Sequence, residues 1–164
     1  MGGEADHADG ATAVPAGRID EALAKAAFLG ALETYSQKFG TFFLAKLLGL
    51  DIGFTEHSCV VEMEVHDYMF NPQGSLHGGV ISTILDISMG HLLNHKAGPG
   101  ATLEMKVQFV RAVRRGRVRC EATFIKQGRT VSYIEARLVD DEQRPLAVGT
   151  STWQLLRHRE ATAS

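Results

Sequence analysis

The stretch that decides the fold is Gly78–Lys96, GGVISTILDISMGHLLNHK, in the middle of the chain. Apolar residues lie on nearly every side of the helix that this spacing predicts: Val80, Ile81, Ile84, Leu85, Ile87, Met89, Leu92 and Leu93. A helix that is apolar all round is buried in the core of a domain. Asp86 interrupts the pattern, and burying an ionised carboxylate without a partner costs several kcal/mol. We therefore predict a buried central helix that carries an acidic side chain in need of an explanation.

Segments in which apolar and polar residues alternate flank this helix on both sides. One segment begins at Cys59, and four more span residues 103–109, 117–124, 131–139 and 146–156. A period of two predicts strands with one solvated face. Turn signals separate the last four segments, so we predict four antiparallel strands in a meander.

The predicted order is therefore a strand, the buried helix and four strands. The economical packing wraps the antiparallel sheet around the helix as an α+β domain. Ahead of it, Asp20 is expected to cap a helix, and a second helical piece follows Gly40. We expect four parts: a flexible tail at residues 1–17, an N-terminal helical extension at 18–48, the main domain at 49–157 and a C-terminal tail at 158–164.

Composition and charge narrow the function. With 164 residues, 45% of them hydrophobic, the chain fits one globular domain, and its net charge of −2 argues against a globally basic nucleic-acid binder. It has no apolar run long enough to span a membrane and no signal-peptide pattern at its start. Cys59 and Cys120 lie in apolar segments without metal-site spacing. We expect reduced thiols, a cytoplasmic location and no membrane partner.

His91 and His95 have the i, i+4 spacing of a pair of metal ligands. The segment lacks the glutamate of the HExxH motif and any evident third ligand. We therefore expect helix-end or interface histidines, and no metal.

The helix opens at His77, Gly78 and Gly79, eight residues before Asp86. Glycines allow a ligand to approach the backbone closely, and the free N–H groups of a helix start favour negative charge. The segment is therefore a candidate oxyanion site. Each feature alone also has a structural explanation: a glycine turn, a capping histidine, an Asn71-Pro72 turn, or an Asp86 paired with a base or with backbone amides.

Together these residues resemble a known family. The stretch NPQGSLHGGVISTILDISMG, residues 71–90, is similar to the motif of hotdog-fold acyl-CoA thioesterases of the PaaI type, in the 4-hydroxybenzoyl-CoA thioesterase superfamily. The similarity extends through residues 100–118 and 126–153. It implies a hotdog fold, in which the sheet wraps around a long central helix. It also implies hydrolysis of an acyl- or aryl-CoA thioester to free acid and coenzyme A, without a bound cofactor.

The resemblance assigns roles to individual residues. Gly78 would donate its N–H to the thioester carbonyl, and Asp86 would act as nucleophile or as general base on water. Asn71 and His77 would position water or substrate, and Thr102 would orient the attacking water. The substrate-binding residues that it implies are Gly79, Gly128, Arg129 and Thr130, the last three in a turn near the nucleotide of coenzyme A.

A distance then predicts the assembly. At 1.5 Å per residue, Asp86 lies roughly 12 Å along the helix from Gly78, too far for both to touch one carbonyl. A two-fold dimer with antiparallel central helices would bring Asp86 of one copy to the helix start of the other. We predict a homodimer, with a dimer of dimers as the larger alternative.

Other interpretations stay open. Five arginines between Arg111 and Arg119 fit either a solvated strand face or a phosphate grip for coenzyme A. A hotdog enoyl-CoA hydratase or dehydratase is the rival enzyme, although Asp86 and His91 diverge by about 140° on a helix and should not meet one substrate. A non-catalytic acyl-CoA binder that contacts a partner through residues 18–48 is the rival outside enzymes.

Overall fold

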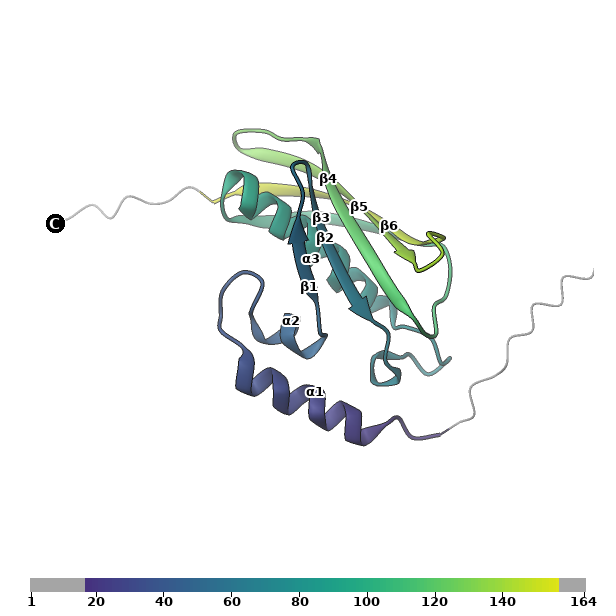
Figure 1. The fold of residues 1–164 in the computed structure, drawn as a ribbon. Helices are drawn as coiled ribbons and strands as arrows, with labels where there is room; N and C mark the ends of the chain where they lie inside the picture. Colours follow the sequence, from purple (N-terminus) through teal and green to yellow (C-terminus); the bar gives the residue numbers. More distant parts are fainter. Residues whose placement is uncertain (1–16, 157–164) are drawn as a thin grey trace, which may run out of the picture.

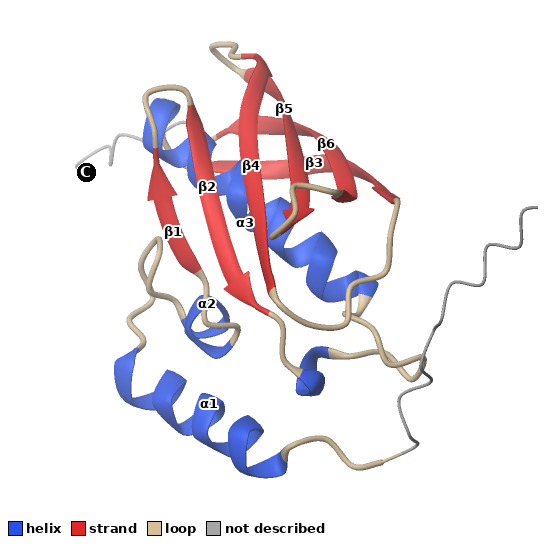
Figure 2. Ribbon diagram, turned by 45° about the vertical axis from the view of Figure 1, so that its right-hand side comes forward, coloured by secondary structure: helices blue, strands red, loops and turns tan. Residues whose placement is uncertain are grey.

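A computed structural model describes residues 17–156, which form an antiparallel sheet curved around one long helix (Figure 1). The helices are α1 Glu21–Thr34, α2 Phe43–Leu47 and α3 Gly78–Ala97, with a short 3-10 helix at Asp67–Met69. The strands are β1 Asp51–Phe54, β2 Ser58–Glu64, β3 Gly100–Phe109, β4 Arg117–Lys126, β5 Val131–Asp140 and β6 Pro145–Leu155. The predicted α+β architecture, a sheet wrapped around a central helix, is confirmed (Figure 2).

The helix α3 is buried as its apolar circumference predicts. Its side chains Ile84, Leu85, Met89, Leu92 and Leu93 are fully buried against the concave face of the sheet. His77 caps the helix at its start, and Gly98, with a φ of 103°, ends it in a conformation that glycine adopts readily. The burial of these apolar groups is the main favourable contribution to the stability of the domain.

The strand pairing differs from the prediction in one respect. The sheet order is β1-β2-β4-β5-β6-β3, so only β4, β5 and β6 form a meander, and β3 pairs with β6 at the edge of the sheet. Residues 110–116 carry the chain from β3 past the sheet end to β4, which pairs with β2. The four-strand meander was wrong because alternation identifies a strand without identifying its partner.

The short strand β1 was not predicted. It is only four residues long, and three of them are exposed, so it has no alternating pattern to recognise. It pairs with β2 from Asp51 opposite Glu62 to Phe54 opposite Cys59. The sheet is therefore six-stranded, with β1 and β3 at its two edges.

The N-terminal extension forms two helices. Asp20 caps α1 by accepting a hydrogen bond from the Leu23 N–H at 2.9 Å, as predicted. The ring of Phe43 on α2 meets the rings of Phe28 and Tyr35 edge to face. In Figure 2, α2 lies between α1 and the sheet.

The predicted tails at residues 1–17 and 158–164 lie outside the described residues apart from Gly17, and the boundaries of the four parts stay predictions.

Candidate active site

The carboxylate of Asp86 lies on the wall of a cavity. Thr102 on β3 donates a hydrogen bond from its Oγ1 to Asp86 Oδ1, at 3.0 Å. Within residues 17–156, Asp86 forms no ion pair and accepts no hydrogen bond from a backbone amide. Asp86 is only half-buried, so the full burial expected from sequence is wrong for the single chain. Its hydrogen-bond partner Thr102 lies on β3, an edge strand of the sheet.

The cavity beside Asp86 has a volume of about 690 Å³. Its lining is mainly apolar, and it includes Phe39, Phe42, Ile87, Met105 and Trp153. This volume lies in the range of sites that hold small organic ligands, about 300–1,000 Å³. A smaller cavity of about 480 Å³ between α1 and β2 contains none of the predicted site residues. We therefore place the candidate site at Asp86.

Two aromatic residues of this cavity, Phe39 and Phe42, come from the N-terminal extension and were missed from sequence. They lie in the 35–42 loop between α1 and α2, which has no periodic pattern. Trp153 on β6 was missed as well, and its position opposite Thr102 in the β3–β6 register was hidden by the wrong strand pairing. Only the correct topology places these groups beside Asp86.

The start of α3 exposes one unused backbone donor. His77 caps the helix, because its Nδ1 accepts a hydrogen bond from the Gly79 N–H at 2.8 Å. The N–H of Gly78 makes no hydrogen bond to any group among the described residues. A Cβ on Gly78 would meet the ring of Phe109 at 3.4 Å, an ordinary contact distance. The helix start therefore offers the Gly78 N–H to a ligand, whereas the Gly79 N–H is already bonded to His77 Nδ1.

Asn71 is occupied by its own loop. Its Oδ1 accepts hydrogen bonds from the N–H groups of Gln73 and Ser75, at 3.0 and 3.3 Å. Its Nδ2 donates to Ser75 Oγ at 3.1 Å. This is the turn role that Asn-Pro predicts by itself. Asn71 thus shapes the approach to the helix start, and its place in the site stays a prediction.

The turn at Gly128, Arg129 and Thr130 lies at the other end of α3. Gln127, the residue before it, donates a hydrogen bond to the carbonyl of Lys96 at 3.5 Å. A Cβ on Gly128 would lie 2.0 Å from the carbonyl oxygen of Val131, so only glycine fits there. Both Arg129 and Thr130 are exposed. The predicted residues thus fall into three places in one chain: the helix start, the Asp86–Thr102 pair and this turn.

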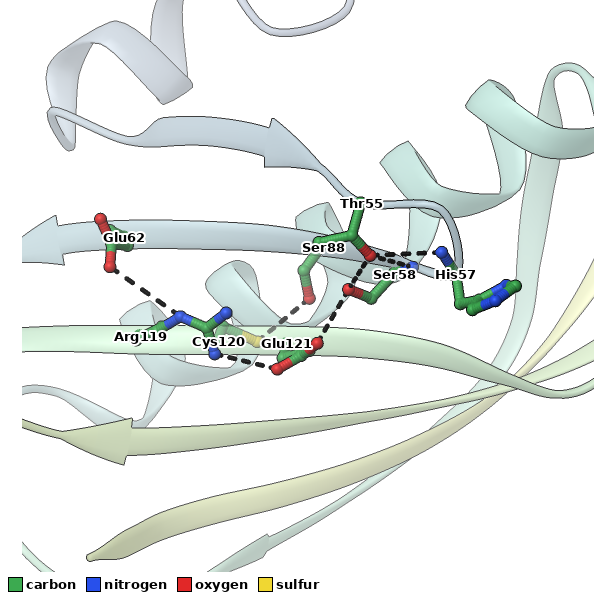
Figure 3. Close-up of polar contacts among 8 residues, drawn as sticks. All are labelled: Thr55, His57, Ser58, Glu62, Ser88, Arg119, Cys120 and Glu121. Atoms are coloured by element: carbon green, nitrogen blue, oxygen red, sulfur yellow. Dashed lines mark hydrogen bonds and ion pairs between the residues drawn. The ribbon is translucent and has the colours of Figure 1, made fainter. Parts of the chain in front are cut away.

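The arginine cluster separates into two groups. Arg117 and Arg119 lie on β4; Arg117 pairs with Glu62, and Arg119 pairs with both Glu62 and Glu121. Figure 3 shows the two pairs of Arg119, whose Nη1 lies 2.9 Å from Glu121 Oε2. The hydrogen bonds to Arg119 and Ser58 lower the pKa of Glu121. These two arginines have the strand-face role, because carboxylates already hold them.

The remaining arginines lie in the loop between β3 and β4. Arg111, Arg114 and Arg115 are exposed, and none forms an ion pair within the described residues. The carbonyl of Val113 accepts a hydrogen bond from the Leu76 N–H at 2.8 Å, which holds this loop beside the start of α3. This bond brings the backbone of the arginine loop next to the segment that leads into α3, while the three arginine side chains line a pocket with Asp140, Asp141 and Glu142.

Both cysteines are free and buried, on adjacent strands. Burial raises the pKa of Cys59 and of Cys120 to about 12, so neither is a thiolate at neutral pH. Cys120 lies 3.1 Å from the hydroxyl of Ser88 (Figure 3). They are packing residues, because a reactive cysteine needs a lowered pKa and access to solvent.

The two histidines of α3 have separate neighbours. His95 stacks on Phe54 at 4.2 Å between ring centroids. His91 lines the same cavity as Asp86, and the divergence of the two side chains around the helix stays a prediction. Both ring nitrogens of His91 are nevertheless engaged, with Gly40 N–H at 2.9 Å and the Ile87 carbonyl at 2.8 Å. Within the described residues, no cluster of three or more His, Cys, Asp or Glu side chains has the arrangement of a metal site.

Comparisons with known proteins identify the family. Residues 73–147 match the Thioesterase superfamily. A Pseudomonas aeruginosa protein whose name describes it as an esterase is 30% identical to this chain over 115 residues. The aligned region spans 66% of this chain and 79% of that protein. The chain belongs to the thioesterase superfamily. It is therefore a thioester hydrolase by family, as the sequence motif predicted.

Further relatives agree with this assignment. Human acyl-coenzyme A thioesterase 13 is 27% identical over 84 residues, which span 49% of this chain and 60% of that protein. Two solved structures share the fold. The Escherichia coli PaaI protein superposes with a TM-score of 0.70 at 20% identity, over 80% of this chain and 96% of its own. A Bacillus halodurans protein solved with CoA has a TM-score of 0.76 at 23% identity, over 91% of this chain and 99% of its own.

No helix among the described residues is both long enough and apolar enough to cross a membrane.

Proposed function

We propose that this thioesterase-superfamily protein hydrolyses acyl- or aryl-coenzyme A thioesters, and that Asp86 acts on the thioester carbonyl. One observation carries the proposal: the Asp86 carboxylate lies on the wall of an apolar cavity, held by Thr102 and unpaired with any base of the described chain. A structural carboxylate would be neutralised by a basic group or by backbone amides. A carboxylate held beside an apolar cavity is suited to accept a proton or to attack.

The reaction needs few groups. In the general-base route, Asp86 takes a proton from water, whose oxygen bonds to the thioester carbonyl carbon. The carbonyl oxygen gains negative charge, which the free N–H of Gly78 stabilises. The C–S bond then breaks, and the thiolate of coenzyme A takes the proton from Asp86. If Asp86 is instead the nucleophile, its oxygen bonds to the carbonyl carbon, the C–S bond breaks and the coenzyme A thiolate leaves and takes a proton from solvent; water then hydrolyses the anhydride to the free acid and restores Asp86. Thr102 orients the carboxylate or the water in either route.

A second copy completes this site in our proposal. Asp86 and Gly78 share one continuous helix, about 12 Å apart along its axis, so one chain does not bring both to one carbonyl. In the single chain the helix start is solvent-accessible, and the edge strand β3 leaves one side unpaired. Large apolar side chains gather around that edge, with Leu103, Phe109 and Val110 each 56% exposed. An apolar, unpaired edge beside an incomplete site fits a homodimer with antiparallel copies of α3. Pairing of two dimers is the larger assembly that we consider.

Arginines at both ends of α3 are the proposed anchors for the phosphates of coenzyme A. Arg111, Arg114 and Arg115 lie in a loop whose backbone bonds to Leu76, just before the helix start, while Arg129 and Thr130 lie at the opposite end. When two helices run antiparallel, the start of one lies toward the end of the other. Both groups would then face the same substrate, one from each copy. Gly79 and Gly128 keep the backbone close to the ligand at these two places.

The proposal requires no metal and no bound cofactor, because a carboxylate, water and a backbone donor are sufficient for thioester hydrolysis. We place the reaction in the cytoplasm, in keeping with two free buried thiols. A hydratase is less well supported, because both nitrogens of His91 are engaged within the fold. A pure acyl-CoA binder would have no need for a carboxylate on the wall of its apolar cavity.

The test is a thiol-release assay with acetyl-, hexanoyl-, palmitoyl- and benzoyl-CoA. We expect Asp86→Asn to lower kcat by about a hundredfold to ten-thousandfold, because the amide keeps the shape and loses the basicity. Asp51→Asn, on the exposed strand β1, is the matched control and should keep the wild-type rate. Unchanged turnover by Asp86→Asn would show that another group does the chemistry. Crotonyl-CoA is added to the series for the rival activity: loss of its enoyl absorbance without thiol release would identify the hydratase, and binding of acyl-CoA without thiol release would identify the binder.

The shared site has its own test. An Asp86→Ala chain mixed with a Gly78→Pro chain forms hybrids in which one of the two sites is intact. Purified hybrids should recover up to about half of the wild-type rate, since symmetry gives two equivalent sites. Hybrids as inactive as the two parents would contradict the two-copy site.

A further inference from the structure

The 35–42 loop of the N-terminal extension is held against the central helix by one histidine. The N–H of Gly40 donates to His91 Nε2 at 2.9 Å, and His91 Nδ1 lies 2.8 Å from the Ile87 carbonyl. Because Nε2 accepts a hydrogen bond, the proton of the neutral ring is on Nδ1 and is donated to Ile87. Burial lowers the pKa of His91, which keeps the ring neutral. Gly40 has a φ of 82°, so glycine is favoured at the point of attachment.

Two aromatic rings of the loop surround this histidine. Phe39 meets the His91 ring edge to face at 5.1 Å between centroids, and Phe42 stacks on it at 6.0 Å. Both phenylalanines line the cavity that contains Asp86. The bond from Gly40 thus places two phenylalanines on the cavity wall.

The position of these rings relative to Asp86 indicates the direction in which a bound acyl group would extend. His91 follows Asp86 by five residues of α3, roughly 7.5 Å along the helix axis. The cavity that both residues line is mainly apolar and includes Ile87, Met105 and Trp153. An acyl group whose carbonyl lies at Asp86 would therefore run along α3 and meet Phe39 and Phe42 at its far end.

We propose that the 35–42 loop, attached through His91, closes the far end of the acyl pocket and limits the length of the acyl group. The inference rests on the proposed thioesterase function and specifies its substrate: an aryl or medium-chain acyl group. Longer chains would have to displace Phe39, which is 56% exposed and is the outer of the two rings. The extension is thus a specificity element.

The test measures kcat/KM for acetyl-, hexanoyl-, dodecanoyl-, palmitoyl- and benzoyl-CoA. Phe39→Ala and Phe42→Ala should each raise the dodecanoyl-to-hexanoyl ratio by about tenfold, the usual discrimination from apolar contacts of this size. Phe28→Ala is the matched control. Phe28 belongs to the same extension and packs on Phe43, but it does not line the cavity. An unchanged ratio in both cavity variants, with intact folding by circular dichroism, would overturn the inference.

Two variants of His91 distinguish the effect of the Gly40 hydrogen bond from the effect of side-chain packing. Gln at this position keeps an acceptor near the place of Nε2, whereas Leu removes it. We expect His91→Leu to broaden the acyl range as Phe39→Ala does, through a lower KM for dodecanoyl-CoA, and His91→Gln to keep the wild-type profile. Equal profiles for the two variants would contradict the role of the Gly40 bond.

Binding can be followed without turnover. Trp153 is the only tryptophan of the chain, it is buried, and it lines the cavity. In the Asp86→Asn background, acyl-CoA that fills the cavity should change its fluorescence, with an affinity that rises to hexanoyl and then falls for longer chains. In a variant that also carries Phe39→Ala, the affinity should no longer decrease for chains longer than hexanoyl. If no thioester is hydrolysed by the wild type, the proposed function fails, while this titration still decides the inference: chain-length-independent binding would overturn it.

Discussion

The start of α3 and the segment around His91 have opposite surroundings. At the start, no group of residues 17–156 accepts a hydrogen bond from the Gly78 N–H, His77 is exposed, and the 110–116 loop bonds to the neighbouring Leu76. Five residues after Asp86, His91 is buried, hydrogen-bonded on both nitrogens and covered by aromatic rings of the extension. Within the single chain, the helix start has a backbone donor available for a ligand, whereas the ring of His91 is fully hydrogen-bonded and packed. In our proposal, the helix start serves the reacting carbonyl, while the segment around His91 serves the acyl group and the stability of the fold.

The largest effect on activity is expected when the N–H of Gly78 alone is removed. Gly78 is the first residue of α3, where proline is tolerated, and His77 before it is extended with a ψ of 135°. Gly78→Pro should therefore fold normally and lower kcat by about a hundredfold to a thousandfold, as loss of an oxyanion donor does.

The control for this variant is Gly78→Ala. It keeps the N–H and adds only a methyl group at 3.4 Å from Phe109. Steady-state kinetics and thermal melting of both variants give the answer. Equal activity of the two would mean that the Gly78 N–H does not contact the developing charge.

A second change tests the packed end. A Cβ on Gly90 would lie 2.9 Å from Trp153 Cη2, so Gly90→Ala must displace the indole. Overpacking of this kind costs about 1–3 kcal/mol, which exceeds the gain of up to about 1 kcal/mol in helix propensity. We expect a lower melting temperature and a shifted Trp153 emission. Gly30→Ala in α1 has open space around the new methyl group and should be neutral or stabilising.

The smallest effect concerns pH. Burial lowers the pKa of His91 in the folded chain, whereas the unfolded value is about 6.5. Below that pH the unfolded chain binds the proton more readily, so the contribution of His91 to stability is complete above about pH 6.5 and is lost as the pH falls through the folded pKa. Urea unfolding at about pH 7.5 and about pH 5.5 measures the loss. His91→Gln should lose less stability over the same interval, and an equal loss would assign the effect to other groups.

Much of the fold could be predicted because its signals are local. The apolar circumference of α3, its opening at His77 and the alternation in β2, β4, β5 and β6 all appear within short stretches of sequence. The Asp20 cap followed from the same kind of pattern. The partner of β3 was not predictable in this way, since Gly100 of β3 and Leu155 of β6 pair across more than fifty residues. In β3 itself a bulge between Thr102 and Glu104 interrupts the alternation and leaves Leu103 exposed.

The candidate site was only partly predictable. Asp86 and Gly78 stood out because a carboxylate and paired glycines are unusual in an apolar helix. Asn71 and His77 were chosen with them, yet their side chains mainly satisfy their own turn and cap. Phe39 and Phe42 gave no signal, since an aromatic residue in an irregular loop looks the same whether it faces solvent or a pocket.

The sequence by itself determined the central helix, five of the six strands and the acidic side chain at position 86, because hydrophobic periodicity and capping act between neighbouring residues. Tertiary structure alone decided that Thr102 meets Asp86, that β3 lies at an open edge and that the 35–42 loop reaches His91. These contacts join segments that are distant along the chain. Their formation depends on how whole elements pack, because each contact is made only after the elements that carry it have found their places around the core.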